Sequence, residues 1–241
     1  MRYSRSKLGK HRVMLTSPSL LPALPETYGM SRSHFLALLD RYGQVVVKPS
    51  GGWGGDGVLF ISRQRGGSYE IVDGRKKQQV LGAEEAYLQV AGKTKAKPHV
   101  VQRKIDLAAV GGRPFDVRVV VQRKQSSDWA VTGILAKIAG PGYRITNVER
   151  SRGRVVPLSA AILQSNIQGK SAGRIQAEVT RMGLQSAELF RQHYGVRKVG
   201  LDIGIDVSGK PWIIEANFKP ADSLFRKLKD KSMYRKIVSL D

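Results

Sequence analysis

Two carboxylates and a carboxamide recur near the end of the chain at spacings that could bind a metal ion. Residues 199–207 and 211–216 are predicted to form two strands of a hairpin joined by the turn 208–210. Strand alternation places Ile213 and Glu215 on one face, Asn217 continues that face, and antiparallel pairing brings Asp202 close. Such oxygen atoms suit Mg²⁺, whereas a surface hairpin with solvated charges fits the same pattern. Both interpretations stay open on this segment alone, and Asp206, nearer to the turn, is not expected among the ligands.

A glycine-rich loop is the second candidate site. Five of the seven residues 51–57 are glycine, so backbone N–H groups could approach phosphate oxygens without interference from Cβ atoms. Lys48, on the strand before the loop, would add a fixed positive charge. A flexible hairpin with an incidental lysine is the alternative, and we favour phosphate binding. The candidate loop residues are Gly51, Gly52, Trp53, Gly54, Gly55 and Gly57.

Two further strands carry polar residues that could act on a bound nucleotide. Residues 102–105 end one predicted strand and could pair with a purine edge, although an ordinary strand end has the same pattern. Asp116 and Arg118 share a face of another strand, and Lys137 lies on the strand that follows. The two cations, Arg118 and Lys137, could stabilise a transferring phosphoryl group. Alternatively, this face could hold a cross-strand salt bridge that includes Asp116.

The elements that position these residues indicate an α+β fold with largely antiparallel sheets. Ser31 or Ser33 could cap a helix that ends at Gly43, and residues 173–194 predict the one long helix. Residues 1–30 are expected to be irregular, and a basic helix is expected near the C-terminus. Two lobes are expected to meet near residues 98–106. The other predicted ranges are strands at 44–48, 58–61, 99–105, 115–122 and 129–137, and the basic helix at 223–240.

Composition limits the function without deciding it. Forty-one Lys and Arg against 19 Asp and Glu give a formal net charge of +22, which attracts polyanions. The cations are spread along the chain and match no nucleic-acid-binding motif, so specific nucleic-acid binding is not expected. The chain has no cysteine, which excludes thiolate chemistry, and no apolar run long enough to span a membrane. No signal peptide is evident at the N-terminus, so a cytoplasmic protein is expected.

In their order along the chain, these motifs resemble the ATP-grasp superfamily, and more closely its YheC/YheD (endospore coat-associated) family. The resemblance covers nearly the whole chain, and the N-terminal domain of longer members is expected to be absent. It implies an ATP-grasp fold with two lobes that clamp a nucleotide, and spore association is a further expectation. The expected divisions are an N-terminal segment (1–30), a smaller lobe with the glycine-rich loop (31–104) and a larger metal- and phosphate-binding lobe (105–241). The motifs lie at residues 7–12, 24–27, 47–58, 101–103, 115–118, 132–134, 200–206 and 214–217.

The resemblance also implies roles for particular residues. Lys48 and the glycine-rich loop would bind phosphate, and Lys7 would be a further nucleotide contact. Arg118 and Lys137 would be catalytic and stabilise charge on the phosphoryl group. The implied metal is Mg²⁺, as two ions, with Mn²⁺ as an alternative; its ligands would be Asp202, Glu215 and Asn217. The residues implied to face adenine are Gln102, Arg103, Lys104 and Ile105.

The implied activity is that of an ATP-dependent, ADP-forming carboxylate–amine or carboxylate–thiol ligase that forms an acyl phosphate. Its partner would be an anionic or carboxylate-bearing substrate such as a peptide. A structural or binding protein that retains the fold, and a small-molecule or peptide kinase, are the alternatives. Two departures from the family pattern concern the phosphate and acceptor sides: Lys137 replaces a common arginine, and Ser151, Arg152 and Gly153 stand where paired glycines are usual.

Overall fold

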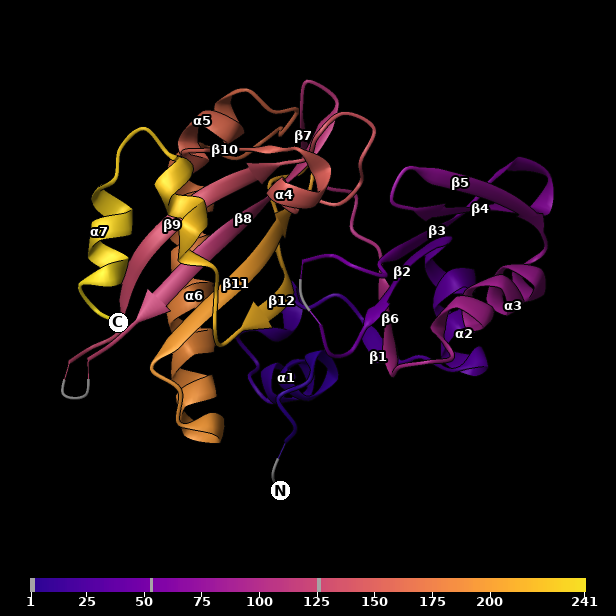
Figure 1. Cartoon of the computed structure of the whole chain (residues 1–241), viewed down its shortest axis with the longest axis horizontal. Helices are drawn as coiled ribbons and strands as arrows, with labels where there is room; N and C mark the ends of the chain where they lie inside the picture. Colours follow the sequence, from indigo (N-terminus) through magenta and orange to yellow (C-terminus); the bar gives the residue numbers. More distant parts are fainter. Residues whose placement is uncertain (1–2, 53, 125–126) are drawn as a thin grey trace. The chain divides into compact units, whose positions relative to one another are not determined.

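The computed structural model describes residues 3–52, 54–124 and 127–241 of the chain. These residues form two compact units (Figure 1). Unit 1 comprises Lys10–Leu24 and Asp106–Asp241 together with Tyr3, and unit 2 comprises Ser4–Gly9 and Pro25–Ile105. Residues 1–30, predicted as one N-terminal segment, are therefore shared between the two units.

Unit 2 is a six-stranded antiparallel sheet with two helices on one face (Figure 1). The helices, α2 (Arg32–Tyr42) and α3 (Ala83–Thr94), pack on alternate residues of the strands, such as Val45, Val47 and Val101. The opposite face carries the intervening side chains. In spatial order the strands are β1 (Thr27–Gly29), β6 (His99–Arg103), β2 (Gln44–Pro49), β3 (Leu59–Arg63), β4 (Ser68–Asp73) and β5 (Lys76–Leu81).

Helix α2 begins and ends where capping chemistry predicts. The Ser31 side chain accepts a hydrogen bond from the backbone N–H of His34 at 3.2 Å. Gly43 ends the helix in the left-handed conformation, with φ of 67°, which glycine adopts without a steric penalty. Burial of Phe35, Leu38 and Leu39 at helical spacing then fixes the helix on the sheet.

Unit 1 is built on a second antiparallel sheet that is covered on both faces. The long helix α6 (Ala172–Tyr194) and α5 (Leu158–Leu163) cover one face, where Val117, Val119 and Leu201 enter the main core. On the other face, η3 (Asp222–Lys227) and α7 (Ser232–Val238) cover an apolar patch around Val120 and Leu135. The strands run β10 (Arg154–Val156), β9 (Ala130–Ile138), β8 (Arg113–Gln122), β11 (Lys198–Ile205) and β12 (Pro211–Asn217), with β7 (Ala109–Val110) paired to β8.

All pairings between these strands are antiparallel, which confirms the predicted α+β class. Two other predictions were wrong. The first 30 residues include α1 (Lys7–Met14), η1 (Leu21–Ala23) and β1 and are not irregular throughout. The predicted C-terminal helix is divided into η3 and α7, because Leu228 is extended and turns its side chain into the same small core as Phe225 and Ile237.

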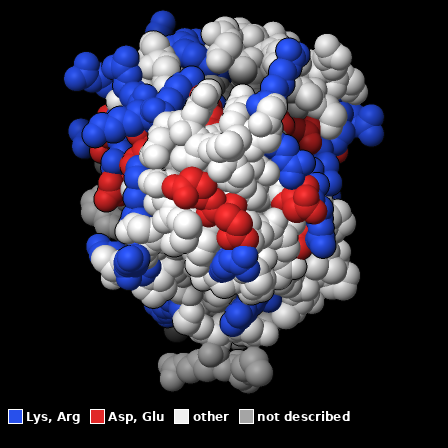
Figure 2. Space-filling view, turned by 90° about the vertical axis from the view of Figure 1, so that its right-hand side faces the viewer, with Lys and Arg blue, Asp and Glu red and all other residues white. Residues whose placement is uncertain are grey.

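Lysine and arginine occur at several separate places on the face drawn in Figure 2, with uncharged surface and a few acidic side chains between them. This distribution agrees with the spread of cations along the sequence. In the part of the chain that the structure describes, no helix is both long and apolar enough to cross a membrane.

Candidate functional site

The face of the unit 1 sheet that lies opposite α6 carries the charged residues, and we call it the polar face. The register places Arg118 of β8 opposite Asp202 of β11, and Asp202 opposite Glu215 of β12. One row of side chains therefore crosses three strands. In the next row, Asp116 of β8 is opposite Lys137 of β9. Pairing between distant segments thus brings the predicted catalytic and metal-binding residues of unit 1 together.

Arg118 and Lys137 both bind Asp202. The Arg118 guanidinium donates two hydrogen bonds to the Asp202 carboxylate, Nε to Oδ1 at 3.0 Å and Nη2 to Oδ2 at 3.1 Å. Lys137 Nζ lies 2.6 Å from the same Oδ1. The cross-strand salt bridge left open as an alternative for this face is therefore present. This salt bridge does not exclude phosphate binding, because it holds Arg118 and Lys137 next to each other on one face, where both could contact a phosphate.

Asp116, which the sequence suggested only as a member of a cross-strand salt bridge, completes the network. Its Oδ2 accepts a hydrogen bond from Thr146 Oγ1 at 2.8 Å and lies 3.2 Å from Lys137 Nζ. Its Oδ1 is buried and has no hydrogen-bond partner among the described residues. The Asp116–x–Arg118 alternation was the available signal, since it put both side chains on one face. Thr146 lies in a loop and could not have been found from the sequence.

Burial and pairing set opposite protonation tendencies for the two aspartates. Burial raises the pKa of Asp116, and Lys137 only partly offsets that effect. Burial also opposes ionisation of Asp202, but Arg118 and Lys137 outweigh it and hold its pKa well below the ordinary value. Burial disfavours the charged form of Arg118, yet Asp202 raises the pKa of that guanidinium. Asp202 and Arg118 are therefore fully charged at neutral pH.

The three predicted metal ligands lie on the polar face, but one step of the prediction was wrong. Simple alternation put Glu215 on the same face as Ile213, whereas Ile213 is in the core beneath α6. Glu215 pairs with Asp202 and Ile213 with Ile203, so β12 has one extra residue, Ile214, between them. This β-bulge turns Glu215 to the polar face. Asn217, opposite Gly200, follows by normal alternation.

These ligands fit a hard cation. Two carboxylates and one carboxamide oxygen on adjacent strands are a donor set of the kind Mg²⁺ takes. The half-buried Glu215 and Asn217 keep some exposure to solvent. Among the described residues no group of three or more His, Asp or Glu side chains could hold a metal, so the predicted set has only two carboxylates and takes its third oxygen from the amide of Asn217.

In unit 2, Lys48 lies in a buried hydrogen-bonded chain. Lys48 Nζ donates to Gln102 Oε1 at 2.9 Å, and Gln102 Nε2 donates to Thr27 Oγ1 at 2.8 Å. Both long side chains are on the face away from α2 and α3, at 6% and 4% exposure. An ammonium held this way is fixed in position, as a phosphate-binding lysine requires.

The glycine-rich loop joins β2 to β3 with backbone angles that favour glycine. Gly52, Gly54, Gly55 and Gly57 have positive φ values of 109°, 79°, 76° and 66°. Gly51 does not, and open space surrounds its Cα. Lys7 joins this region, because its Nζ donates to the carbonyl oxygen of Gly52 at 2.8 Å. Trp53, predicted to contact the nucleotide, lies outside the described residues.

The remaining predicted nucleotide contacts follow Gln102 at the end of β6 and do not converge on Lys48. Arg103 lies over the Tyr42 ring, 4.7 Å from its centroid. Lys104 donates to Gln44 Oε1 at 2.9 Å, and Ile105 is buried. Their side chains are thus held within unit 2, and the backbone N–H groups of Arg103 and Lys104 donate to the carbonyl oxygens of Glu26 and Gln44.

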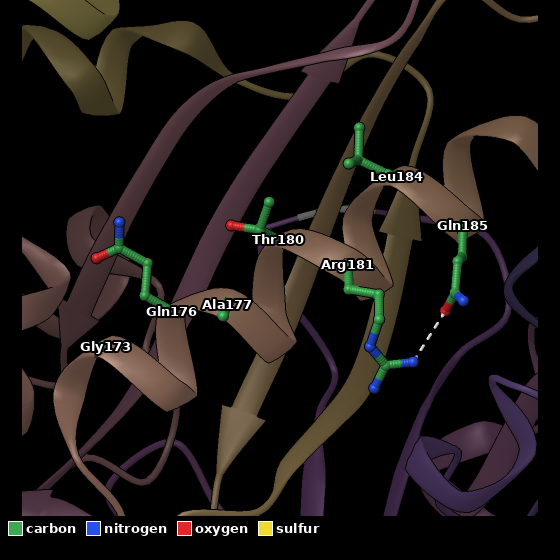
Figure 3. Close-up of a pocket in the computed structure, with 7 residues that line it drawn as sticks. All are labelled: Gly173, Gln176, Ala177, Thr180, Arg181, Leu184 and Gln185. Carbon is green, nitrogen blue, oxygen red and sulfur yellow. Dashed lines mark hydrogen bonds between the residues drawn. The ribbon is translucent and has the colours of Figure 1, made fainter.

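A hollow of about 560 Å³ lies elsewhere, along α6 (Figure 3). All of its lining residues belong to that helix, and Arg181 Nη1 donates to Gln185 Oε1, one turn further along the helix, at 3.4 Å. The rest of the lining contains no carboxylate and none of the predicted site residues; it consists of Gly173, Gln176, Ala177, Thr180 and Leu184. The hollow is therefore separate from the chemistry of the polar face.

Known proteins resemble this chain over most of its length. A family described as "YheC/D like ATP-grasp" matches residues 2–240. Endospore coat-associated protein YheD of Bacillus subtilis (strain 168) is 26% identical over 229 residues, which cover 91% of this chain and 49% of YheD. Endospore coat-associated protein YheC of the same strain is 22% identical over 205 residues, covering 83% and 55%. The chain therefore spans about half the length of these relatives.

Two solved structures share the fold. One is the ATP-grasp ligase PsnB complexed with minimal precursor, Mg and ADP, with a TM-score of 0.54, 13% identity and coverage of 97% of this chain and 56% of PsnB. The other is the C-terminal domain of K. lactis Pby1, an ATP-grasp enzyme interacting with the mRNA decapping enzyme Dcp2. It has a TM-score of 0.54, 15% identity and coverage of 98% and 71%. The predicted ATP-grasp fold is confirmed.

Proposed function

Because the chain belongs to the YheC/D-like ATP-grasp family, we propose that it is an ATP- and Mg²⁺-dependent ligase that activates a carboxylate as an acyl phosphate. The observation that carries this proposal is the row formed by Arg118, Asp202 and Glu215 on the polar face. It combines a fixed cation with oxygen ligands, which is the combination phosphoryl transfer needs. The description of PsnB with a precursor peptide supports a peptide as the substrate.

Each unit would supply different groups. In unit 2, Lys48 and the N–H groups of the glycine-rich loop would bind phosphate oxygens, with Lys7 holding the loop at Gly52. In unit 1, Asp202, Glu215 and Asn217 would hold Mg²⁺, and Mn²⁺ has the same preference for oxygen. Bound Mg²⁺ would neutralise charge on the phosphates.

The proposed reaction has two steps. A substrate carboxylate oxygen attacks the γ-phosphorus of ATP, and the bond to the bridging oxygen breaks to release ADP. An amine or thiol then attacks the acyl carbon, loses its proton and displaces inorganic phosphate. Arg118 and Lys137 would stabilise negative charge on the phosphoryl oxygens during the first step, since both are fixed by Asp202.

Trapping of the acyl phosphate tests this chemistry. The protein is incubated with ATP, Mg²⁺, a panel of acidic peptides and hydroxylamine, which converts an acyl phosphate to a hydroxamate. We expect ADP, inorganic phosphate and a peptide hydroxamate in equal amounts. A phosphorylated product without inorganic phosphate would identify a kinase instead.

A structural or binding role is the second candidate. The network of Asp116, Arg118, Lys137 and Asp202 pairs two cations with two carboxylates, so these four side chains balance one another without any ligand. The names of YheD and YheC also associate those relatives with the endospore coat. For that role we expect no binding of ATP in the presence of Mg²⁺.

A further inference from the structure

The segment between β9 and β10 borders the polar face. Thr146 donates a hydrogen bond to Asp116, which anchors the segment beside Lys137. Two residues later, Val148 begins the short helix α4 (Val148–Ser151) and is buried with Phe225 and Leu228 of the cluster on the same side of the sheet. The segment is therefore part of the surroundings of the proposed reaction site in unit 1.

The exposed side chains of this segment are mainly cationic. Residues 143–153 contain three arginines, Arg144, Arg150 and Arg152, and one acidic residue, Glu149. Lys227 Nζ of η3 lies 3.8 Å from Glu149 Oε1, which places Lys227 near the residue that precedes Arg150. We call Arg144, Arg150, Arg152 and Lys227 the arginine border.

Arg152 is unusual within this border. Its φ of 53° makes it the one non-glycine residue with positive φ in the described part of the chain. The position ends α4, and glycine would occupy it at lower conformational cost. The exposed guanidinium forms no hydrogen bond or ion pair with any described residue. Within the described chain, the Arg152 side chain therefore makes no hydrogen bond or ion pair that offsets this cost, which points to a contact with a ligand.

We propose that the arginine border binds the carboxylates of an acidic polypeptide substrate next to the group that reacts. The inference rests on the proposed function and specifies its substrate class. Guanidinium groups pair with carboxylates through two parallel hydrogen bonds. Binding of single-stranded nucleic acid uses stacked aromatic side chains, whereas residues 143–153 contain one aromatic residue, the half-buried Tyr143. The border thus favours a polypeptide over a nucleic acid.

Substitution of Arg152 by glycine separates peptide binding from folding, because it should weaken binding without lowering the stability of the fold. Arg152→Gly removes the guanidinium and relieves the backbone strain, so we expect an unchanged or higher melting temperature. Affinity for a fluorescent deca-glutamate peptide, measured by anisotropy at 150 mM salt without ATP, should fall about tenfold, the loss expected for one charge-assisted hydrogen bond. Arg152→Gln should weaken binding by a similar factor.

Arg154 provides a matched control only two residues away. It is exposed, but it pairs with Ile138, whose side chain enters the core beneath α6, so Arg154 lies on the other face of the sheet. Arg154→Gln removes the same charge and should leave peptide affinity within about twofold of the original, since substitutions at independent surface sites have small effects.

Three results would overturn the proposal. They are no binding of deca-glutamate, equal losses in the Arg152 and Arg154 variants, and tighter binding of deca-uridylate RNA with the same dependence on Arg152. Nucleotide binding is measured separately on the same samples. Peptide binding without nucleotide binding would contradict the proposed ligase while leaving the arginine border in place, and the reverse result would contradict the border alone.

Discussion

The buried pair of Lys137 and Asp116 makes the network on the polar face sensitive to single substitutions. Lys137→Met would leave Asp116 buried without its cation, while Asp202 would keep Arg118. Removing one partner of a buried pair costs about 3–5 kcal/mol, so we expect a loss of that order in the free energy of unfolding, measured in urea. Adding Asp116→Asn should recover most of the loss, because it removes the uncompensated charge. A loss below about 1 kcal/mol, or no recovery in the double variant, would contradict this description of the network.

Asp206 closes the hairpin turn and is bound there by residues of the turn and of β12. Its Oδ1 accepts from the backbone N–H groups of Ser208 and Lys210 at 2.9 and 3.0 Å, and its Oδ2 from Trp212 Nε1 at 2.9 Å. Burial opposes its charge, but these hydrogen bonds outweigh burial and lower the pKa of Asp206.

The lowered pKa of Asp206 predicts how its contribution depends on pH. A depressed folded-state pKa stabilises the fold above the unfolded value of about 3.9, and this stabilisation is lost as the pH falls through the folded value. Asp206→Ala should therefore cost about 1–3 kcal/mol at pH 7 and distinctly less near pH 3, by urea unfolding at each pH. An equal cost at both pH values would show that the ionised carboxylate is not responsible.

At the level of elements, two glycines of the glycine-rich loop, Gly57 and Gly51, are expected to respond differently to substitution by alanine. A Cβ on Gly57 would lie 3.1 Å from Pro49 Cγ, and its φ is 66°. Gly57→Ala should lower the free energy of unfolding by about 1–2 kcal/mol, because a side chain is strained in that backbone conformation. Gly51→Ala, with a common φ and open space around it, should change it by less than about 0.5 kcal/mol. Equal effects would mean that the loop does not hold these backbone angles in solution.

Local signals in the sequence predicted some elements well. Ser31 and Gly43 mark the ends of α2, and the periodic apolar residues of 173–194 predict α6, because capping and helical periodicity are short-range properties. The C-terminal helix was mispredicted because Leu228 packs into a core whose other members, Val120 and Leu135, are distant in the sequence. No local rule contains that contact.

The candidate site, like the fold, was predicted where local strand patterns decide it and missed where long-range packing does. Strand alternation placed Asp116 with Arg118, and the hairpin placed Asp202 near Glu215. The bulge at Ile214 was not predicted, since it depends on the register between β11 and β12. Thr146 was missed because its loop reaches Asp116 through tertiary packing.

At the scale of the whole molecule, net charge and chain length determine which experiments can test the proposed function. A net charge of +22 favours anionic ligands in general, so affinity for an anion is not by itself evidence for the site. A dependence of binding on Mg²⁺ and on single residues is more specific evidence for the site than affinity for an anion alone. Because the chain spans about half the length of YheD and YheC, the acceptor of the proposed reaction is best sought with acidic peptides and not by analogy with those proteins.

Calorimetric titration of a non-hydrolysable ATP analogue, with and without Mg²⁺, tests the central claim most directly. We expect binding that strengthens at least tenfold with Mg²⁺ in the original protein. Glu215→Gln should abolish most of that gain, because it removes a charged ligand, while the melting temperature stays within about 3 °C. Absence of nucleotide binding under both conditions, or a gain from Mg²⁺ that survives Glu215→Gln, would contradict the account.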